Sequence, residues 1–312
     1  MKPEIVSWLL EGDPSIRWQV QRDLLNSPPA KYEAERRKIA KEGWGAKLLA
    51  LQDPIGTWGG GIYGPKWIST TYTMLTLRLL GLPPNNPQAK RACKLFLDEG
   101  FYIDGGINFF SYSWKYSETC VTGMILALLA YFKHPDKRMH SIALHLINQQ
   151  MPDGGWNCRS YKGATHSSFH TTILALEGLY EYQNTYPDKK KKIGSVRERG
   201  NEFLLAHRLY KSHKTGKVFD AAMTRMTFPQ RWRYDFIRAL DYFRACDAPR
   251  DERMNDAIEL LQKKQKKDGL WPLNSGMPGR KFFDLEEAGQ PSRWNTLRAL
   301  RILKWWNGMG GE

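Results

Sequence analysis

Thiol, imidazole and carboxylate side chains recur at positions where they could bind a metal ion. Glu118 and Cys120 are two residues apart, Cys158 follows a Gly-Gly-Trp turn, and His166 and His170 are four residues apart. Thiolate and imidazole together suit zinc, and three protein ligands would leave one position open for a substrate. The alternatives are a core position for Cys120 and hydrogen bonding at a helix N-terminus for the two histidines. Zinc is therefore an open expectation for the cofactor.

Basic residues near predicted helix starts are candidates for binding an anion. Arginine can hold a phosphate through two parallel hydrogen bonds, and lysine adds a mobile charge. Helix N-termini contribute free backbone N–H groups. For Arg159 and Lys162, the alternative is that both side chains are solvated at the surface. The candidates for an anionic head group are Arg159, Lys162, Arg231, Arg233 and Arg293.

Three further residues are candidates for acid–base catalysis. Tyr234 and Asp235 are adjacent at the start of a predicted helix, and His170 opens the preceding inner helix. A carboxylate in an apolar cavity can have a raised pKa and so exchange protons near neutral pH. The alternative for Asp235 is ordinary complementation of the helix dipole in a first turn.

Composition restricts the class of protein. The 312 residues are 41% hydrophobic and 12% aromatic, which is typical of a soluble globular chain and predicts one domain over 1–312. The net charge of +15 favours an anionic partner, either a small molecule or a lipid, and no nucleic-acid-binding motif is present. Four cysteines without a C-x-x-C pair indicate reduced thiols and a cytoplasmic location. No apolar run approaches the roughly 20 residues of a membrane span; contact with a membrane surface stays open.

These residues belong to a chain with an internal repeat. A glutamine, a Gly-containing turn and a tryptophan recur at 52–58, 150–156 and 265–271, and 104–107 is a degenerate copy. Such a repeat at long, similar intervals is typical of helical arrays. Tryptophan offers a large apolar surface with one N–H to satisfy, so we expect the turn tryptophans to be structural.

Apolar residues at helical spacing predict twelve helices in six pairs and no strand. Six apolar stretches form an inner set, beginning near residues 15, 69, 117, 167, 231 and 292. Six amphipathic stretches lie between them, at roughly 4–10, 34–51, 87–99, 136–150, 194–207 and 251–265. Closing the array into a ring would bury both of its ends. We therefore predict an all-α fold, a closed α/α toroid of about six helical hairpins.

The repeat resembles that of the α/α-toroid superfamily of squalene/terpene cyclases and protein prenyltransferase β subunits. The segment 154–162 is similar to the G-G-[FW]-x-x-R-x-x-K segment of the prenyltransferases, in which the Arg and Lys hold an isoprenoid diphosphate. Glu118-Thr119-Cys120 resembles their D-x-C pair of zinc ligands, and His170 has a place like that of the zinc histidine. Two features depart from the family pattern. In the prenyltransferases the D-x-C pair follows the R-x-x-K segment in the same repeat, whereas Glu118 and Cys120 lie one repeat before it. The D-x-D-D motif of the cyclases is absent from the sequence.

The resemblance implies a terpene cyclase- or prenyltransferase-like protein that binds or transforms an isoprenoid diphosphate, or a similar lipid, in a central cavity. Two alternatives stay open. One is a carbohydrate-active lyase or glycosidase on the same fold, which would need two carboxylates across the cavity. Asp53, Asp104, Asp153 and Asp235 are available for that role. The other is a non-catalytic scaffold, because a fold does not fix a function.

Overall fold

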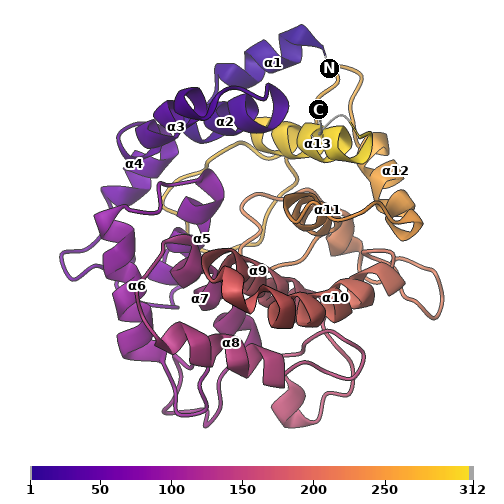
Figure 1. Ribbon diagram of the computed structural model, residues 1–312. Coiled ribbons are helices and arrows are strands. Elements are labelled where there is room, and N and C mark those ends of the chain that lie inside the picture. The colour runs from indigo at the N-terminus through magenta and orange to yellow at the C-terminus, as the bar shows by residue number, and fades with distance from the viewer. Residues whose placement is uncertain (1, 309–312) are drawn as a thin grey trace.

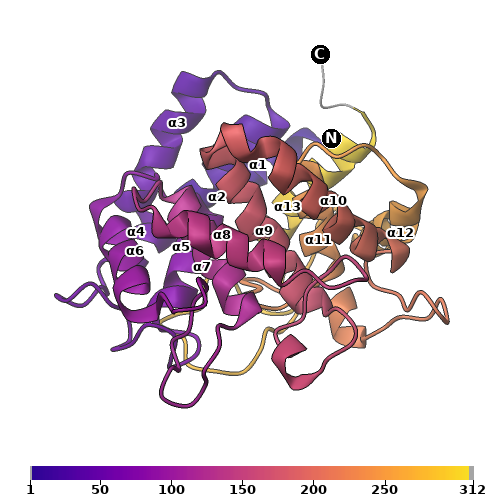
Figure 2. The same ribbon diagram turned by 60° about the horizontal axis from the view of Figure 1, so that its bottom comes forward.

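The computed structural model describes residues 2–308, and this part of the chain is all-helical, with no strand. Figures 1 and 2 show the helices following one another around a common centre. The thirteen α-helices among these residues are α1 (Pro3–Leu10), α2 (Pro14–Gln19), α3 (Pro29–Arg37), α4 (Gly43–Leu49), α5 (Thr70–Leu80), α6 (Pro87–Gly100), α7 (Thr119–Tyr131), α8 (Arg138–Asn148), α9 (Phe169–Thr185), α10 (Lys190–Ala206), α11 (Phe236–Ala245), α12 (Asn255–Lys263) and α13 (Arg293–Trp306). None of them is both long and apolar enough to cross a lipid bilayer.

Two kinds of helix alternate along the chain. Helices such as α7 are buried on almost every side, whereas α6, α8 and α12 bury one stripe and expose the rest. The second kind lies at the periphery in Figure 1. The buried helices pack on one another at close range: a Cβ added to Gly123 of α7 would meet the Leu174 carbonyl oxygen of α9 at 2.6 Å. Only glycine permits so close a backbone contact.

The tryptophan turns share one hydrogen-bond pattern. Trp58, Trp156 and Trp271 are fully buried. Each indole Nε1 donates to the carbonyl ten residues upstream, at 2.6, 2.7 and 2.7 Å respectively. Each backbone N–H donates to a threonine hydroxyl of the following buried helix, and the turn glutamine donates to a carbonyl inside its own turn. The burial and the hydrogen bonds agree with the structural role expected of these tryptophans.

The degenerate turn keeps part of this pattern. Ile107 stands where the other copies have tryptophan, and its N–H donates to Thr122 Oγ1 at 3.1 Å. The carboxylate of Asp104 accepts from the N–H and hydroxyl of Ser117 at 2.8 and 2.6 Å. The turn therefore holds α7 through polar contacts although the indole is missing.

The two ends of the described chain are in contact. Helix α13 packs on α2 and on the π-helical turn that follows it, Val20–Leu24. Arg301 of α13 donates to Gln19 Oε1 at 2.6 Å and approaches Asp23 at 3.3 Å. Arg293 Nε donates to the Trp8 carbonyl at 2.9 Å, which ties α1 to α13.

Two predicted boundaries were wrong. The stretch 34–51 is not one helix, because the chain leaves the helix after Ala40 and resumes at Gly43, whose φ is +67°. The helix predicted to begin near Arg231 begins at Phe236, since Arg231 itself has a φ of +59°. Left-handed backbone at these positions interrupts a helix, and an apolar pattern does not reveal it.

Candidate functional site

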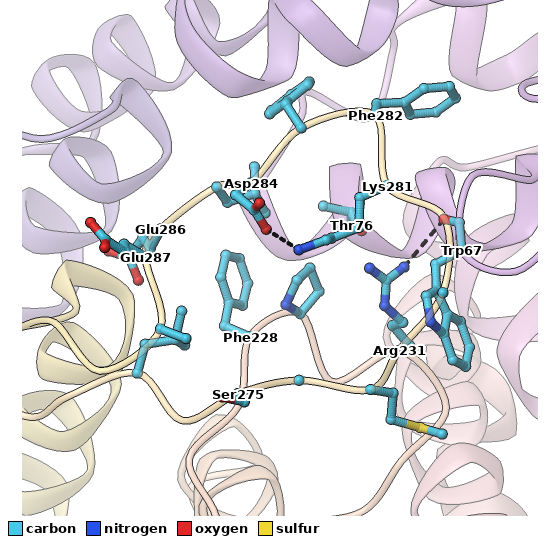
Figure 3. Close-up of a pocket in the computed structure, with 18 of the residues that line it drawn as sticks. Trp67, Thr76, Phe228, Arg231, Ser275, Lys281, Phe282, Asp284, Glu286 and Glu287 are labelled. Carbon is cyan, nitrogen blue, oxygen red and sulfur yellow. Dashed lines mark hydrogen bonds and ion pairs between the residues drawn. The ribbon is translucent and has the colours of Figure 1, made fainter.

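The larger central cavity has a mixed lining, in which apolar residues are accompanied by five charged ones, Arg231, Lys281, Asp284, Glu286 and Glu287. It has a volume of about 620 Å³ and lies between α5, the turn before α11, and a long segment that precedes α13. Figure 3 shows Trp67, Phe228 and Phe282 around it, with Thr76 contributed by α5. We call this space the large chamber. Its size suits a ligand with a substantial hydrocarbon part.

The segment 273–288 crosses the chamber, and we call it the strap. The indole Nε1 of Trp67 donates to the Pro278 carbonyl at 2.9 Å, and the Trp67 N–H donates to the Arg280 carbonyl at 3.1 Å. At its other end Asn274 exchanges hydrogen bonds with Met226. The strap therefore joins the turn before α5 to the segment before α11 and covers the chamber between them.

A second, smaller cavity of about 230 Å³ lies toward the C-terminal halves of α5, α7 and α9. We call it the basic chamber, because arginines dominate its charged lining. The negative ends of helix dipoles favour cations in this position. Its eight arginines and three carboxylates are Arg22, Arg36, Arg78, Arg231, Arg238, Arg244, Arg298 and Arg301, with Glu177, Glu181 and Asp241.

Most of these arginines are paired. Arg78 Nη2 lies 2.8 Å from Glu181 Oε1, and Arg301 Nε lies 2.9 Å from Asp241 Oδ1. Burial alone would raise the pKa of Asp241, but the attraction of Arg301 and other arginines outweighs it and holds that pKa well below its ordinary value. The pairs make the wall of the basic chamber rigid, and the excess of arginine leaves it positive.

Arg231 lines both chambers. Its Nη1 donates to the Trp67 carbonyl at 3.2 Å, and its guanidinium lies 4.8 Å from the centre of the Trp67 ring (Figure 3). Among residues 2–308 no carboxylate forms an ion pair with it. Burial lowers the pKa of Arg231 to about 10, so the side chain stays charged at neutral pH. It is a half-buried cation at the junction of the two chambers, without a counter-ion among the described residues.

The other predicted anion ligands lie elsewhere. Arg159 and Lys162 are exposed, and the Lys162 ammonium lies 4.8 Å from the Trp114 ring. Arg293 serves the contact with α1 and lies 4.5 Å from the Trp8 ring. Arg233 covers the Trp232 ring at 5.3 Å. Of the five predicted residues, the structure brings only Arg231 to the chambers.

The predicted acid–base residues are engaged in structural contacts. The Tyr234 hydroxyl donates to the Leu209 carbonyl, and the Tyr234 N–H donates to His170 Nδ1 at 2.9 Å. Asp235 caps α11 by accepting from the Arg238 N–H at 2.7 Å. Burial raises the pKa of Asp235 to about 6 despite the opposing charge of Arg298, and burial lowers the pKa of His170 to about 4.

The predicted metal ligands do not assemble. Glu118 and Cys120 lie at the start of α7, whereas Cys158 lies in the loop after the Trp156 turn, where its N–H donates to Thr171 Oγ1 at 3.3 Å. His166 Nδ1 instead pairs with the Thr165 hydroxyl at 2.8 Å, at an exposed position, and His170 accepts from Tyr234. In the part of the chain that the structure describes, no three His, Cys, Asp or Glu side chains are placed to hold a metal ion. The residues therefore do not fit a zinc centre.

The turn carboxylates expected for a carbohydrate-active enzyme are also occupied. Asp153 accepts from the Ser167 N–H at 2.8 Å and from its hydroxyl, as Asp104 does from Ser117. Asp53 accepts from Thr57 Oγ1 at 2.9 Å. These carboxylates hold the turns together.

Sequence reasoning missed the paired charges of the basic chamber. Arg78, Glu177, Arg238 and Arg298 each lie within a stretch that was read as an apolar inner helix. Most of these apolar stretches contain one charged residue, and this could have indicated the ion pairs. Burial of an isolated charge is costly, so a charged residue in a buried helix requires a partner. The Gly- and Pro-containing run 272–291 was likewise the signal for the strap.

Comparison with known proteins gives little beyond this geometry. No family model matches the chain, and no curated protein sequence matches it. A solved structure described as a protein from Actinoplanes is similar over 94% of this chain and 90% of its own, with 16% sequence identity and a TM-score of 0.47.

Proposed function

We propose that the helices form a closed α/α toroid of six hairpins, and that the toroid binds an amphiphilic anion at its centre. The contact between α13 and α2 supports the closure, because it joins the first and last hairpins. The three equivalent tryptophan turns support a common hairpin unit.

The ligand we propose is an isoprenoid diphosphate or a similar lipid phosphate, as in a terpene cyclase- or prenyltransferase-like protein. The observation behind it is the position of Arg231, which lines both the basic chamber and the large chamber and has no carboxylate partner among residues 2–308. A phosphate would satisfy this guanidinium by charge-assisted hydrogen bonds. The hydrocarbon part would then lie against Phe228, Phe282 and the strap.

The test measures binding of farnesyl diphosphate by calorimetry and by the rise in melting temperature of the full-length chain. Inorganic diphosphate, farnesol and a neutral oligosaccharide serve as comparison ligands. We expect farnesyl diphosphate to bind most tightly, because it fills both chambers. Its affinity should fall with salt concentration, since the contact is ionic.

Arg231→Gln should weaken that binding by about 10- to 100-fold, the range for losing a hydrogen bond to a charged group. Arg225→Gln is the matched control, because Arg225 is exposed and makes no ion pair in the described chain. Arg159→Ala with Lys162→Ala separates the inner site from the exposed one. If that double variant abolishes binding and Arg231→Gln does not, the head group binds at the rim. Stabilisation by the oligosaccharide alone would favour the carbohydrate-active alternative, and no response to any ligand would favour a scaffold.

A further inference from the structure

Two neighbouring loops expose a group of aromatic side chains. The loop 105–117 precedes α7 and the loop 157–168 precedes α9, and Figure 2 shows both loops at the same end of the molecule. These residues, which we call the aromatic face, are Phe110, Tyr112, Trp114 and Tyr161. Tyr112 is fully exposed, and each of the other three exposes more than a third of its surface. Single exposed aromatic residues are common on proteins, whereas a group of them marks an interaction surface.

Packing between the two loops makes the aromatic face one surface. The Tyr161 ring stacks on the Tyr116 ring of the other loop, with 3.4 Å between the ring centres. Lys162 follows Tyr161 in the chain, and its ammonium lies 4.8 Å from the centre of the Trp114 ring. The ring centres of Trp114 and Tyr116 are in turn 6.0 Å apart. A partner that contacts one loop therefore contacts the other as well.

An asparagine fixes the shape of each loop. The Asn108 amide donates to the Trp114 carbonyl at 2.8 Å, and the Asn157 amide donates to the His166 carbonyl at 2.7 Å. In both loops the asparagine Oδ1 also accepts from the N–H two residues further on, at 2.8 and 2.9 Å respectively. Hydrogen bonds within the loops thus hold the aromatic face in place, so little conformational entropy is lost when it binds a partner.

The charged side chains of the two loops are all basic. Neither loop contains an aspartate or a glutamate, and Lys115, Arg159 and Lys162 are exposed. Tryptophan and tyrosine are enriched at the membrane–water interface, because each has an apolar ring and a polar group that stays hydrated. Lysine and arginine add attraction to anionic lipids. A second copy of this chain would instead bring like charges together, so an anionic bilayer is the partner that fits.

We propose that the aromatic face docks the protein on an anionic lipid membrane. The four rings lie in the headgroup region, and Lys115, Arg159 and Lys162 contact the lipid phosphates and carboxylates. The net charge of +15 adds attraction over a longer range. None of these seven residues lines the large chamber or the basic chamber. The proposal is therefore independent of the ligand proposed for the centre of the molecule.

The test measures cosedimentation of the full-length protein with lipid vesicles. One set of vesicles consists of phosphatidylcholine with about 30% phosphatidylserine, and the other of phosphatidylcholine alone. We expect binding to the anionic vesicles to be at least about tenfold tighter, because each lysine or arginine near an anionic surface strengthens binding about fivefold. Added salt should weaken this binding, since it screens the charges.

Two double variants separate the contribution of the rings from that of the charges. Tyr112→Ala with Trp114→Ala should weaken binding to the anionic vesicles about tenfold, because it removes apolar surface that enters the bilayer. Lys115→Gln with Lys162→Gln should weaken the same binding about 25-fold, which is about fivefold for each charge.

Two further variants serve as controls. Lys190→Gln with Lys191→Gln removes the same charge at the start of α10, which follows the C-terminal end of α9, whereas the loop 157–168 precedes the N-terminal end of α9. This variant should change binding by less than about twofold, because screening limits the attraction to charges near the bilayer. Arg231→Gln should bind vesicles like the wild type, so that this proposal and the proposed central ligand can fail separately.

Wild-type protein that does not bind the anionic vesicles, or an equal loss of binding in the α10 variant, would overturn the proposal. A dimer of the vesicle-free protein that Tyr112→Ala dissociates would also overturn it, since the aromatic face would then contact a second copy of the chain. Far-ultraviolet circular dichroism of each variant checks the fold. The comparison of the two vesicle sets with wild-type protein decides the question even where a variant misfolds.

Discussion

Arg238 and Glu177 form a two-pronged ion pair between α11 and α9. Arg238 Nε lies 2.7 Å from Glu177 Oε1, and Arg238 Nη2 lies 2.9 Å from Glu177 Oε2. Arg238 also donates to the carbonyls of Arg231 and Arg233, at 3.1 and 2.7 Å. The pair therefore shapes the turn that presents Arg231 to both chambers, in addition to joining two helices.

Glu177→Gln should destabilise the protein by about 3–5 kcal/mol at neutral pH, because it leaves Arg238 without its buried counter-charge and Arg78 with Glu181 alone. Burial alone would raise the pKa of Glu177, but Arg238 and Arg78 hold it below the ordinary 4.5. A depressed carboxyl pKa stabilises the fold above the unfolded value and ceases to do so as the pH falls through the folded value. The difference between wild type and variant, measured by urea unfolding, should therefore shrink below about pH 4.5. Glu198→Gln, at an exposed position, is the control, and an equal effect there would contradict the assignment.

Trp156→Ala should lower the free energy of unfolding by about 3–5 kcal/mol, the range for deleting a large buried aromatic side chain. The variant loses the packing of a fully buried indole and its hydrogen bond to the Leu146 carbonyl. Tyr112→Ala is the comparison, since Tyr112 is 100% exposed and its removal should change stability by less than about 0.5 kcal/mol. If Trp156→Ala unfolds like the wild type but no longer binds the ligand, Trp156 belongs to the binding site and not to the structural framework.

Gly279→Ala should loosen the strap. The φ of Gly279 is +150°, and an added Cβ would lie 2.3 Å from the Trp67 indole nitrogen, which holds the strap through Pro278. The added Cβ should strain the strap by about 1–3 kcal/mol. We therefore expect limited proteolysis to cleave the strap of the variant on the order of tenfold faster than that of the wild type. Gly276→Ala is a matched control in the same strap, because a Cβ there meets nothing within 4 Å. Equal cleavage rates for the two variants would show that the Trp67 contact does not hold the strap.

The all-helical class and the role of the tryptophan turns could be predicted from local pattern alone. Glutamine, glycine and tryptophan at fixed spacing determine each turn through contacts within about ten residues, as the Trp156–Leu146 hydrogen bond illustrates. The site could not be predicted in the same way. Arg231 acquires its position from Trp67, 164 residues away, and Glu177 meets Arg238 across 61 residues. Pairing over such separations depends on how the helices are arranged, and helical periodicity carries no information about it.

The constant ten-residue separation between each indole and its acceptor carbonyl has a consequence for the modularity of the chain. The stretches 48–58, 146–156 and 261–271 close the same loop with the same donor and acceptor, and each is received by a threonine hydroxyl. The three stretches are therefore structurally equivalent, and each makes the same hydrogen bonds to the helix before it and to the helix after it. In a chain of this kind a hairpin can be exchanged or duplicated while the hydrogen bonds between neighbouring hairpins stay the same. The charged residues at the centre can then change independently of these hydrogen bonds.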